Sequence, residues 1–248
     1  MYFNNTSCDL YIGTGAGKKL MEELAQAKSS IKIVSPYVSA QLASGLAALH
    51  QQGVAVQLIT CENDSYSELL QTLVRQEVHI DSTACKWRNR LNAGSWMVSV
   101  ILFISLLVVV WSFSRQQISW LMSGSVVLLA SVLIMVILRY LKKRIRVKTY
   151  SYSSIFPIKV LRQRNEYGRR ATFLHSKIYI IDDQIAYLGS LNFTRSGTET
   201  NYETRIRITD PSALAKILEE FNYLLNENDC PKLDIQYWGS LHFREPLN

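Results

Sequence analysis

The fold is decided by residues 175–192, which read HSKIYIIDDQIAYLGSLN. Two apolar runs in this stretch, Lys177–Asp182 and Ile185–Leu188, lie on either side of a short polar turn, a pattern that predicts a pair of strands. Further apolar runs alternate with helical patterns before and after the stretch, and this alternation is typical of an α/β domain. We therefore expect an α/β fold in which helices flank a mixed sheet.

The other elements of this domain are predicted from hydrophobic periodicity. The expected helices are Gly17–Ala27, Ala40–His50, Tyr66–Gln76 and Ser212–Asn226, and the expected strands are Ile31–Ser35, Val54–Thr60, Val78–Ile80, Ile158–Leu161 and Tyr202–Ile208. Asp210 and Pro211, a capping residue and a first-turn proline, open the last helix. The tail from Cys230 onward shows no strong period.

A long uncharged segment interrupts this pattern. Leu91–Ser114 and Gln116–Leu138 are runs of 24 and 23 residues without a charge, separated only by Arg115. Each exceeds the roughly 20 apolar residues that a helix needs to cross the hydrocarbon core of a bilayer. We therefore expect a two-helix transmembrane hairpin over residues 86–148, inserted between two parts of one soluble domain, residues 1–85 and 149–248.

The positive charge of the chain is concentrated around this hairpin. The 248 residues carry a net charge of +7, yet ten basic residues and no acidic one lie between Lys86 and Lys148, so the rest of the chain is slightly acidic. Nine of the ten flank the two runs, and Arg115 alone lies between them. The flanking cations are Lys86, Arg88, Arg90, Arg139, Lys142, Lys143, Arg144, Arg146 and Lys148.

This asymmetry predicts the orientation of the hairpin, because cytoplasmic flanks of membrane spans carry an excess of Lys and Arg. No secretory signal follows Met1. We expect an integral inner (cytoplasmic) membrane protein with a cytoplasmic catalytic domain and a short loop near Arg115 on the far side. The cluster from Arg139 to Lys148 also suits phosphorylated lipid or nucleic acid, although topology alone accounts for it.

Stretch 175–192 also carries the candidate chemistry. Alternate side chains of a strand share a face, so His175 and Lys177 are expected to point the same way, about 7 Å apart, with Asp182 on the opposite face. That arrangement suits a nucleophile and a cation converging on one phosphate, whereas Asp182 is expected to serve structure. Gly189 is expected to let the backbone approach a bound anion, and Ser190 and Asn192 supply hydrogen-bond donors.

These residues follow the pattern H-x-K-x(4)-D-x(6)-G-S-x-N. The chain matches every fixed position of this pattern and so resembles the phospholipase D superfamily, of which the pattern is typical. A looser resemblance extends to Ile31–Tyr37 and Gly53–Thr60. It covers most of the soluble part and none of the hairpin. The resemblance implies a phospholipase D-like mixed sheet and a phosphodiesterase that needs no metal and no cofactor.

The resemblance also implies a role for each residue of the site. His175 would attack phosphorus and form a phosphohistidine, while Lys177, Ser190 and Asn192 would bind the non-bridging oxygens. Glu203 matches the acidic residue that orients the nucleophilic imidazole. The cysteines, Cys8, Cys61, Cys85 and Cys230, lack metal-ligand spacing.

The mechanism of this family needs two histidines, and the chain has one complete motif. The other histidines are His50, His79 and His242, and none has a downstream Gly-Ser-x-Asn. We therefore expect a homodimer in which two copies of His175 share one active site across the two-fold axis.

Two substrate classes stay open. Six basic residues and one acid between Pro157 and Lys177 favour a nuclease, with Arg169 and Arg170 as phosphate-binding residues. The six are Lys159, Arg162, Arg164, Arg169, Arg170 and Lys177. Tyr150, Tyr152 and Phe156 are candidates either for stacking on unpaired bases or for interfacial anchoring. The alternative is a phospholipid hydrolase or phosphatidyl transferase, which the hairpin would hold near its lipid substrate.

Overall fold

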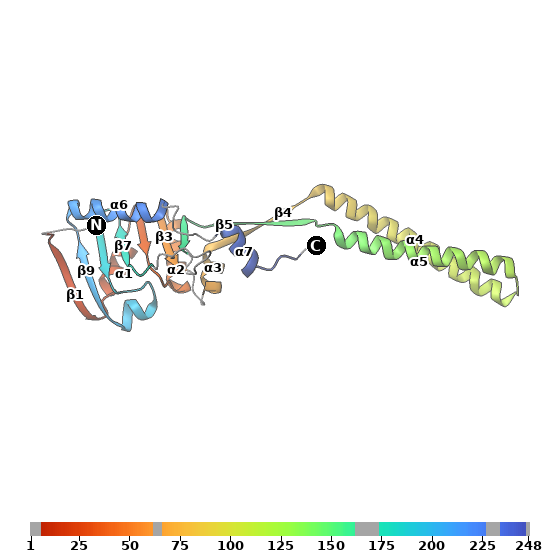
Figure 1. The fold of residues 1–248 in the computed structure, drawn as a ribbon, viewed down its shortest axis with the longest axis horizontal. Coiled ribbons are helices and arrows are strands. Elements are labelled where there is room, and N and C mark those ends of the chain that lie inside the picture. The colour runs from red at the N-terminus through yellow and green to blue at the C-terminus, as the bar shows by residue number, and fades with distance from the viewer. Residues whose placement is uncertain (1–5, 62–65, 162–173, 227–233, 247–248) are drawn as a thin grey trace, which may run out of the picture. The chain divides into compact units, whose positions relative to one another are not determined.

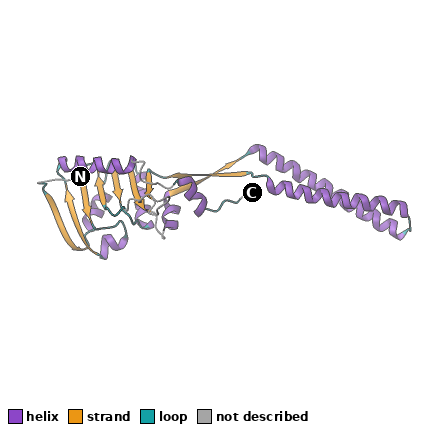
Figure 2. Ribbon diagram, viewed as in Figure 1, coloured by secondary structure: helices purple, strands orange, loops and turns teal. Residues whose placement is uncertain are grey.

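A computed structural model describes residues 6–61, 66–161, 174–226 and 234–246. They form two compact units (Figures 1 and 2). The first unit comprises residues 1–77 and 152–244 and contains the large sheet with its helices. The second comprises residues 78–151 and 245–248 and contains two long helices.

The first unit is built on a seven-stranded sheet with the strand order β1-β9-β8-β7-β2-β3-β6. Strands β2, β3 and β6 run parallel to one another, and all other neighbours are antiparallel. The strands are β1 (Cys8–Thr14), β2 (Ser30–Val34), β3 (Ala55–Cys61), β6 (Ile158–Leu161), β7 (Ile178–Ile181), β8 (Ile185–Gly189) and β9 (Tyr202–Ile208). The predicted mixed α/β class is confirmed.

Helices cover both faces of this sheet. In Figure 1, α6 (Pro211–Asn226) lies above the sheet, and α1 (Lys18–Ala25), α2 (Ala40–Gln51) and α3 (Tyr66–Leu73) lie below it. Ile180, Ala186 and Ile208 of the sheet pack with Leu214 and Phe221 of α6, so this helix closes a continuous apolar core. The last helix, α7, covers Ile235–His242.

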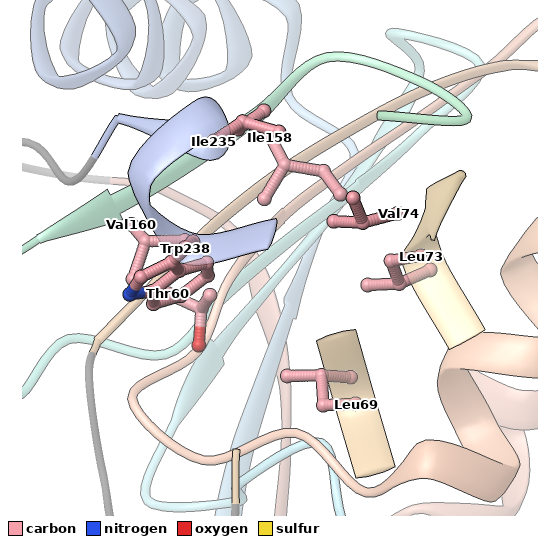
Figure 3. A pocket seen from close by; sticks show the side chains of 8 residues that line it. All are labelled: Thr60, Leu69, Leu73, Val74, Ile158, Val160, Ile235 and Trp238. Atoms are coloured by element: carbon pink, nitrogen blue, oxygen red, sulfur yellow. The ribbon is translucent and has the colours of Figure 1, made fainter. Parts of the chain in front are cut away.

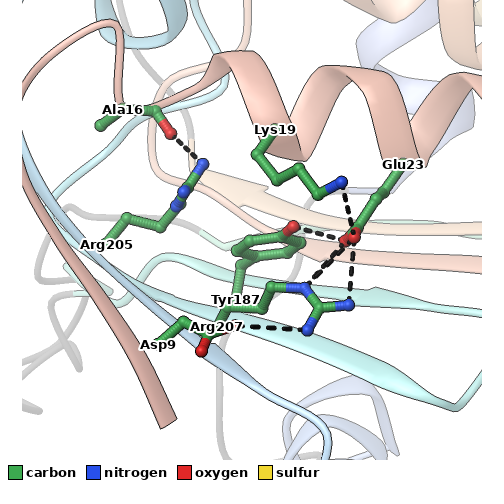
Figure 4. Close-up of polar contacts among 7 residues, drawn as sticks. All are labelled: Asp9, Ala16, Lys19, Glu23, Tyr187, Arg205 and Arg207. Atoms are coloured by element: carbon green, nitrogen blue, oxygen red, sulfur yellow. Dashed lines mark hydrogen bonds and ion pairs between the residues drawn. The ribbon is translucent and has the colours of Figure 1, made fainter.

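A cluster of charged groups joins α1 to strands β8 and β9 (Figure 4). Glu23 of α1 accepts a hydrogen bond from the Tyr187 hydroxyl and pairs with the Arg207 guanidinium at 3.1 Å. Arg207 also pairs with Asp9 of β1 at 3.5 Å. Partial burial raises the pKa of Glu23, but the hydrogen bonds from Tyr187 and Arg207 outweigh it and keep that pKa below its usual value.

The second unit is a pair of antiparallel helices, α4 (Ser82–Ser114) and α5 (Ile118–Arg144). Small side chains lie between the two helices, and a Cβ added to Gly124 would lie 3.0 Å from a methyl group of Val109. By length and composition both helices are long and apolar enough to cross a membrane. Strands β4 (Val74–Ile80) and β5 (Lys148–Ser154) form a two-stranded sheet at the start and end of this segment.

Most predicted elements are found within a few residues of their expected bounds, but four were missed. These are β1, β5, α7 and a single π-helical turn, η1 (Ser196–Thr200). Strand β1 is an exposed edge strand that is stabilised by its pairing with β9. Because it has no buried face, its sequence lacks the apolar alternation from which a strand is predicted. The third helix is shorter than predicted because β4 begins at Val74.

Candidate active site

His175 and Lys177 lie directly before β7 and contact each other. Strand β7 begins only at Ile178. The Lys177 ammonium therefore folds back to donate to the His175 carbonyl oxygen at 2.8 Å, and it lies 2.9 Å from His175 Nδ1. The two residues therefore precede the strand and do not lie on it, as the prediction had them. Their side chains point the same way, as expected, and their polar ends converge.

The two groups differ in their access to solvent. The His175 side chain is exposed, whereas Lys177 is only 5% exposed. Burial lowers the pKa of Lys177, and the charge of the nearby Glu203 carboxylate partly offsets this shift. A poorly hydrated ammonium beside an accessible imidazole is well suited to hold a phosphate oxygen.

Ser190 and Glu203 are joined at the end of the β8–β9 pair. The Ser190 hydroxyl donates to the Glu203 carboxylate, which also accepts from the Asn201 side chain at 3.2 Å. The Thr204 backbone N–H donates to the Ser190 hydroxyl at 3.0 Å. The role predicted for Glu203, accepting from the His175 ring, stays a prediction, and Asn201 is a neighbour that sequence reasoning missed.

Gly189 is needed for the spacing of two strands. A Cβ added there would overlap the carbonyl oxygen of Thr204 on β9. The backbone N–H of Ser190 donates to this same oxygen at 3.0 Å. Gly189 therefore permits a close approach to a neighbouring strand, and its predicted approach to an anion stays a prediction.

The backbone at Asn192 is firmly held. Thr194 N donates to Asn192 O at 2.8 Å, and Gly197 packs against this carbonyl so closely that a Cβ would overlap it. The side-chain Oδ1 atom is buried and has no hydrogen-bond partner among the residues that the structure describes. Because Oδ1 can only accept a hydrogen bond, an anion would have to bind the Nδ2 donor of this amide.

The segment Ser35–Ser39, after β2, is fastened to the residue that follows Asn192. Phe193 N donates to the Ser35 hydroxyl at 2.9 Å, and Ser39 N donates to Phe193 O at 3.0 Å. Between these two contacts, Tyr37 remains 46% exposed. Sequence reasoning missed Tyr37 as a functional candidate, although Ser35-Pro36-Tyr37 directly after a buried strand was a usable signal.

Asp182 has a structural role. Its carboxylate accepts hydrogen bonds from the backbone N–H groups of Lys28, Ser29 and Ser30 at 2.7–3.0 Å. It thereby ties the β7–β8 turn to the loop before β2. This agrees with the expectation that Asp182 serves structure.

Several proposed substrate contacts are wrong. Tyr152 and Phe156 are buried, so neither offers a stacking surface. Lys159 is also buried and donates to the Leu224 carbonyl at 2.6 Å, so it is not part of an exposed basic strip. The four arginines of that strip, including Arg169 and Arg170, lie outside the described residues.

The remaining histidines and one cavity lie apart from this chemistry. His50 Nδ1 lies 3.0 Å from Val54 O, and His79 Nε2 lies 2.6 Å from the Ser151 hydroxyl. A cavity beside α3 and α7 (Figure 3) has a single polar lining residue, Thr60, and no titratable group. Within the described ranges no group of His, Cys, Asp and Glu side chains is arranged to hold a metal ion.

Comparison with known proteins gives one family match. A family model described as cardiolipin synthase, PLD-like domain, matches residues 108–225. No curated protein matches the chain.

Among solved structures, the chain is similar to NucT from Helicobacter pylori, at 16% identity and a TM-score of 0.47, with 92% of this chain and 99% of that chain covered. It is also similar to Nuc, a phospholipase D family member from Salmonella typhimurium (14%, 0.45, 92% and 99%). A third is phosphatidylserine synthase from Haemophilus influenzae (13%, 0.43, 92% and 40%).

Proposed function

We propose that the chain is a member of the phospholipase D superfamily and a phosphodiesterase that acts through a phosphohistidine at His175. The observation that carries the proposal is the position of the Lys177 ammonium, 2.9 Å from the Nδ1 atom of an exposed imidazole. A phosphate oxygen that binds this ammonium is brought directly to the nucleophile.

The reaction we propose is an in-line displacement. A ring nitrogen of His175 attacks phosphorus, the bond to the leaving oxygen breaks, and a general acid protonates that oxygen. Lys177, Ser190 and Asn192 stabilise the charge that develops on the non-bridging oxygens. Glu203 orients the imidazole. Water then cleaves the phosphorus–nitrogen bond and restores the histidine. Because these side chains provide the charge and proton transfers, the proposed reaction needs no metal.

The general acid is proposed to be His175 of a second copy. The exposed position of His175 leaves it accessible to such a partner. Subunit exchange tests this: wild-type protein mixed with His175→Ala forms heterodimers with one histidine in the shared site. Activity is then expected to fall as the square of the wild-type fraction. A linear fall would show that each chain works alone.

We propose nucleic acid as the substrate, with unpaired strands favoured. Two exposed tyrosines border the site residues: Tyr37, in the segment fastened to Phe193, and Tyr202, which directly precedes Glu203 and is 75% exposed. Exposed aromatic rings beside a phosphate site provide stacking platforms for bases. Phospholipid is the second candidate, favoured by the two long apolar helices, which would hold the site near a membrane.

We further propose that α4 and α5 cross the inner membrane, with the large sheet in the cytoplasm and the turn at Arg115 on the far side. The charge distribution around the two apolar runs supports this orientation.

The decisive experiment uses the full chain in detergent with EDTA. It is assayed against single-stranded DNA, RNA, duplex DNA and labelled anionic phospholipids, with His175→Ala as the control. Cleavage of a polynucleotide that is lost in the variant supports the proposal. Cleavage of lipid alone would replace nucleic acid by the second candidate, and activity retained in His175→Ala would overturn the mechanism.

A further inference from the structure

The pairing of α4 with α5 brings two separate groups of cations to the same end of the hairpin. Ser95 of α4 donates to Met135 of α5 at 3.3 Å, and Asp81 N donates to Val147 O at 3.0 Å. Residues 86–90 and 139–148 are therefore neighbours, although about fifty residues separate them in the chain. We name their nine cations the cationic collar: Lys86, Arg88, Arg90, Arg139, Lys142, Lys143, Arg144, Arg146 and Lys148.

The charge of the collar is not neutralised locally. None of its cations is buried, and none forms an ion pair within the part of the chain that the structure describes. Asp81, the acid next to it in the chain, caps α4 by accepting from the backbone N–H groups of Thr83 and Ala84. Nine cations that are exposed or partly exposed and lack a counter-charge form a site for anions.

Two aromatic rings are part of this surface. Trp87 and Tyr140 are 55% and 56% exposed. The Arg90 guanidinium lies 5.4 Å from the centre of the Trp87 ring, and that of Arg144 lies 5.1 Å from the centre of the Tyr140 ring. Arg144 also donates to the Tyr140 hydroxyl at 2.6 Å. Rings with an apolar body and a polar tip favour the headgroup level of a bilayer.

The collar also has the right height for that level. Arg90 directly precedes the apolar run of α4, and Arg139 directly follows that of α5. At about 1.5 Å per helical residue, the helical parts of the collar span about 6–8 Å. The headgroup layer on one side of a bilayer has a similar thickness, about 5–8 Å. The cations would thus lie at the depth of lipid phosphates, where a nucleic acid has less access.

We infer that the cationic collar binds the headgroups of anionic phospholipids and so gives the protein a preference for anionic regions of the membrane. The inference rests on the proposed membrane crossing of α4 and α5 and is independent of catalysis. An excess of Lys and Arg is enough to orient a membrane span. The stacking of Arg90 on Trp87 and of Arg144 on Tyr140 is not needed for orientation, so it supports a binding role for the collar.

The test uses the full chain in nanodiscs of phosphatidylcholine with a minority of phosphatidylglycerol, which offer the same lipids on both faces whatever the orientation. Native mass spectrometry then measures the ratio of the two lipids retained by the protein. Because a cation near an anionic surface changes binding by about fivefold, wild-type protein is expected to enrich phosphatidylglycerol at least about fivefold over the bulk ratio. Lys142→Gln/Lys143→Gln/Arg144→Gln removes three of the nine cations and is expected to lower this enrichment clearly below that of the wild type.

The matched control is Arg115→Gln, which removes a cation at the other end of the hairpin and is expected to keep the enrichment. A conservative Arg144→Lys variant, helical by circular dichroism, is expected to keep most of it. Equal retention of both lipids by the wild type, or the same loss in Arg115→Gln, would overturn the inference. The inference would also be overturned if the triple variant lost binding of a fluorescent oligonucleotide but retained the two lipids in the same ratio as the wild type. That result would assign the collar to nucleic acid.

Discussion

Asp182 is the acid within the motif. The structure predicts that its removal has a large effect on stability and little effect on catalysis. Its backbone is in the left-handed region, at φ +52°, where Asp is tolerated better than most residues. Its carboxylate accepts from three successive backbone N–H groups, those of Lys28, Ser29 and Ser30, and from the Ser29 hydroxyl at 2.9 Å. Asp182→Ala removes all four acceptor contacts at once.

The size of the effect follows from these bonds. A hydrogen bond to a charged group contributes about 1.5–3 kcal/mol, and contributions from one carboxylate are not additive. The site is partly exposed, so water replaces some of the lost bonds. We therefore expect Asp182→Ala to lower the free energy of unfolding by about 3 kcal/mol. For a chain of this length that corresponds to a fall in Tm of about 6–12 °C.

The effect should depend on pH in a defined direction. Partial burial raises the pKa of Asp182, but the hydrogen bonds from Ser30, Lys28 and Ser29 outweigh it, so the pKa lies below its ordinary value. A carboxyl with a lowered pKa stabilises the fold above its unfolded pKa of about 3.9. This stability is lost as the pH falls through the lowered value. The gap between wild type and variant should close in acid.

The assay is thermal and urea unfolding of the full chain in detergent, with kcat measured on the fraction that remains folded. Asp183→Ala is the matched control, because the neighbouring Asp183 is exposed and pairs only with Lys32 among the described residues. It should cost less than about 1 kcal/mol. If Asp182→Ala kept wild-type stability but lost activity, Asp182 would belong to the catalytic groups and the structural assignment would be wrong.

Three further predictions concern the site itself. Burial lowers the pKa of Lys177, and only the protonated ammonium stabilises the phosphate. Activity should therefore fall as the pH rises through this lowered pKa. Lys177→Arg should flatten this alkaline limb of the pH–rate profile, and an unchanged limb would exclude Lys177 as its source. Gly189→Ala forces a methyl group against the Thr204 carbonyl oxygen, so it should lower both the Tm, measured by differential scanning fluorimetry, and kcat. A variant with wild-type values for both would contradict the close spacing of the two strands. Tyr37→Ala should raise the KM for single-stranded DNA about tenfold, because stacking contributes about 1–3 kcal/mol per base. Hydrolysis of bis(4-nitrophenyl) phosphate, which has no base to stack, should stay unchanged. Tyr37→Phe keeps the ring and should keep the wild-type KM. Equal losses on both substrates would show that Tyr37 supports the fold and does not bind bases.

Much of the fold was predictable because its signals are local. The expected strand Tyr202–Ile208 has the same bounds in the structure, and helix α6 begins one residue before its predicted start, at Pro211. In both cases the element is predicted from its hydrophobic periodicity and from the turn or capping residues beside it, and these signals lie within a few residues of each other. The predicted run Leu91–Ser114 likewise falls inside α4, and the run Gln116–Leu138 falls inside α5 except for its first two residues, since length and apolarity alone define such helices.

The site was predicted less completely, because its geometry depends on partners far away in the chain. The spacing of the motif predicted His175, Lys177, Ser190 and Asn192 as a set, and the family resemblance added Glu203. It did not indicate that the ammonium folds back onto the histidine, which depends on where β7 begins pairing with β2.

The sequence by itself therefore determined most of the order of the elements, the two long apolar helices and the candidate motif, since each of these is a property of neighbouring residues. The hairpin pattern also predicted that the two groups of cations lie at the same end. Only the tertiary structure decided that β1 is a strand and that Gly189 serves strand spacing. The reason is physical: an edge strand and a close backbone approach each exist only when segments distant in the chain are brought together.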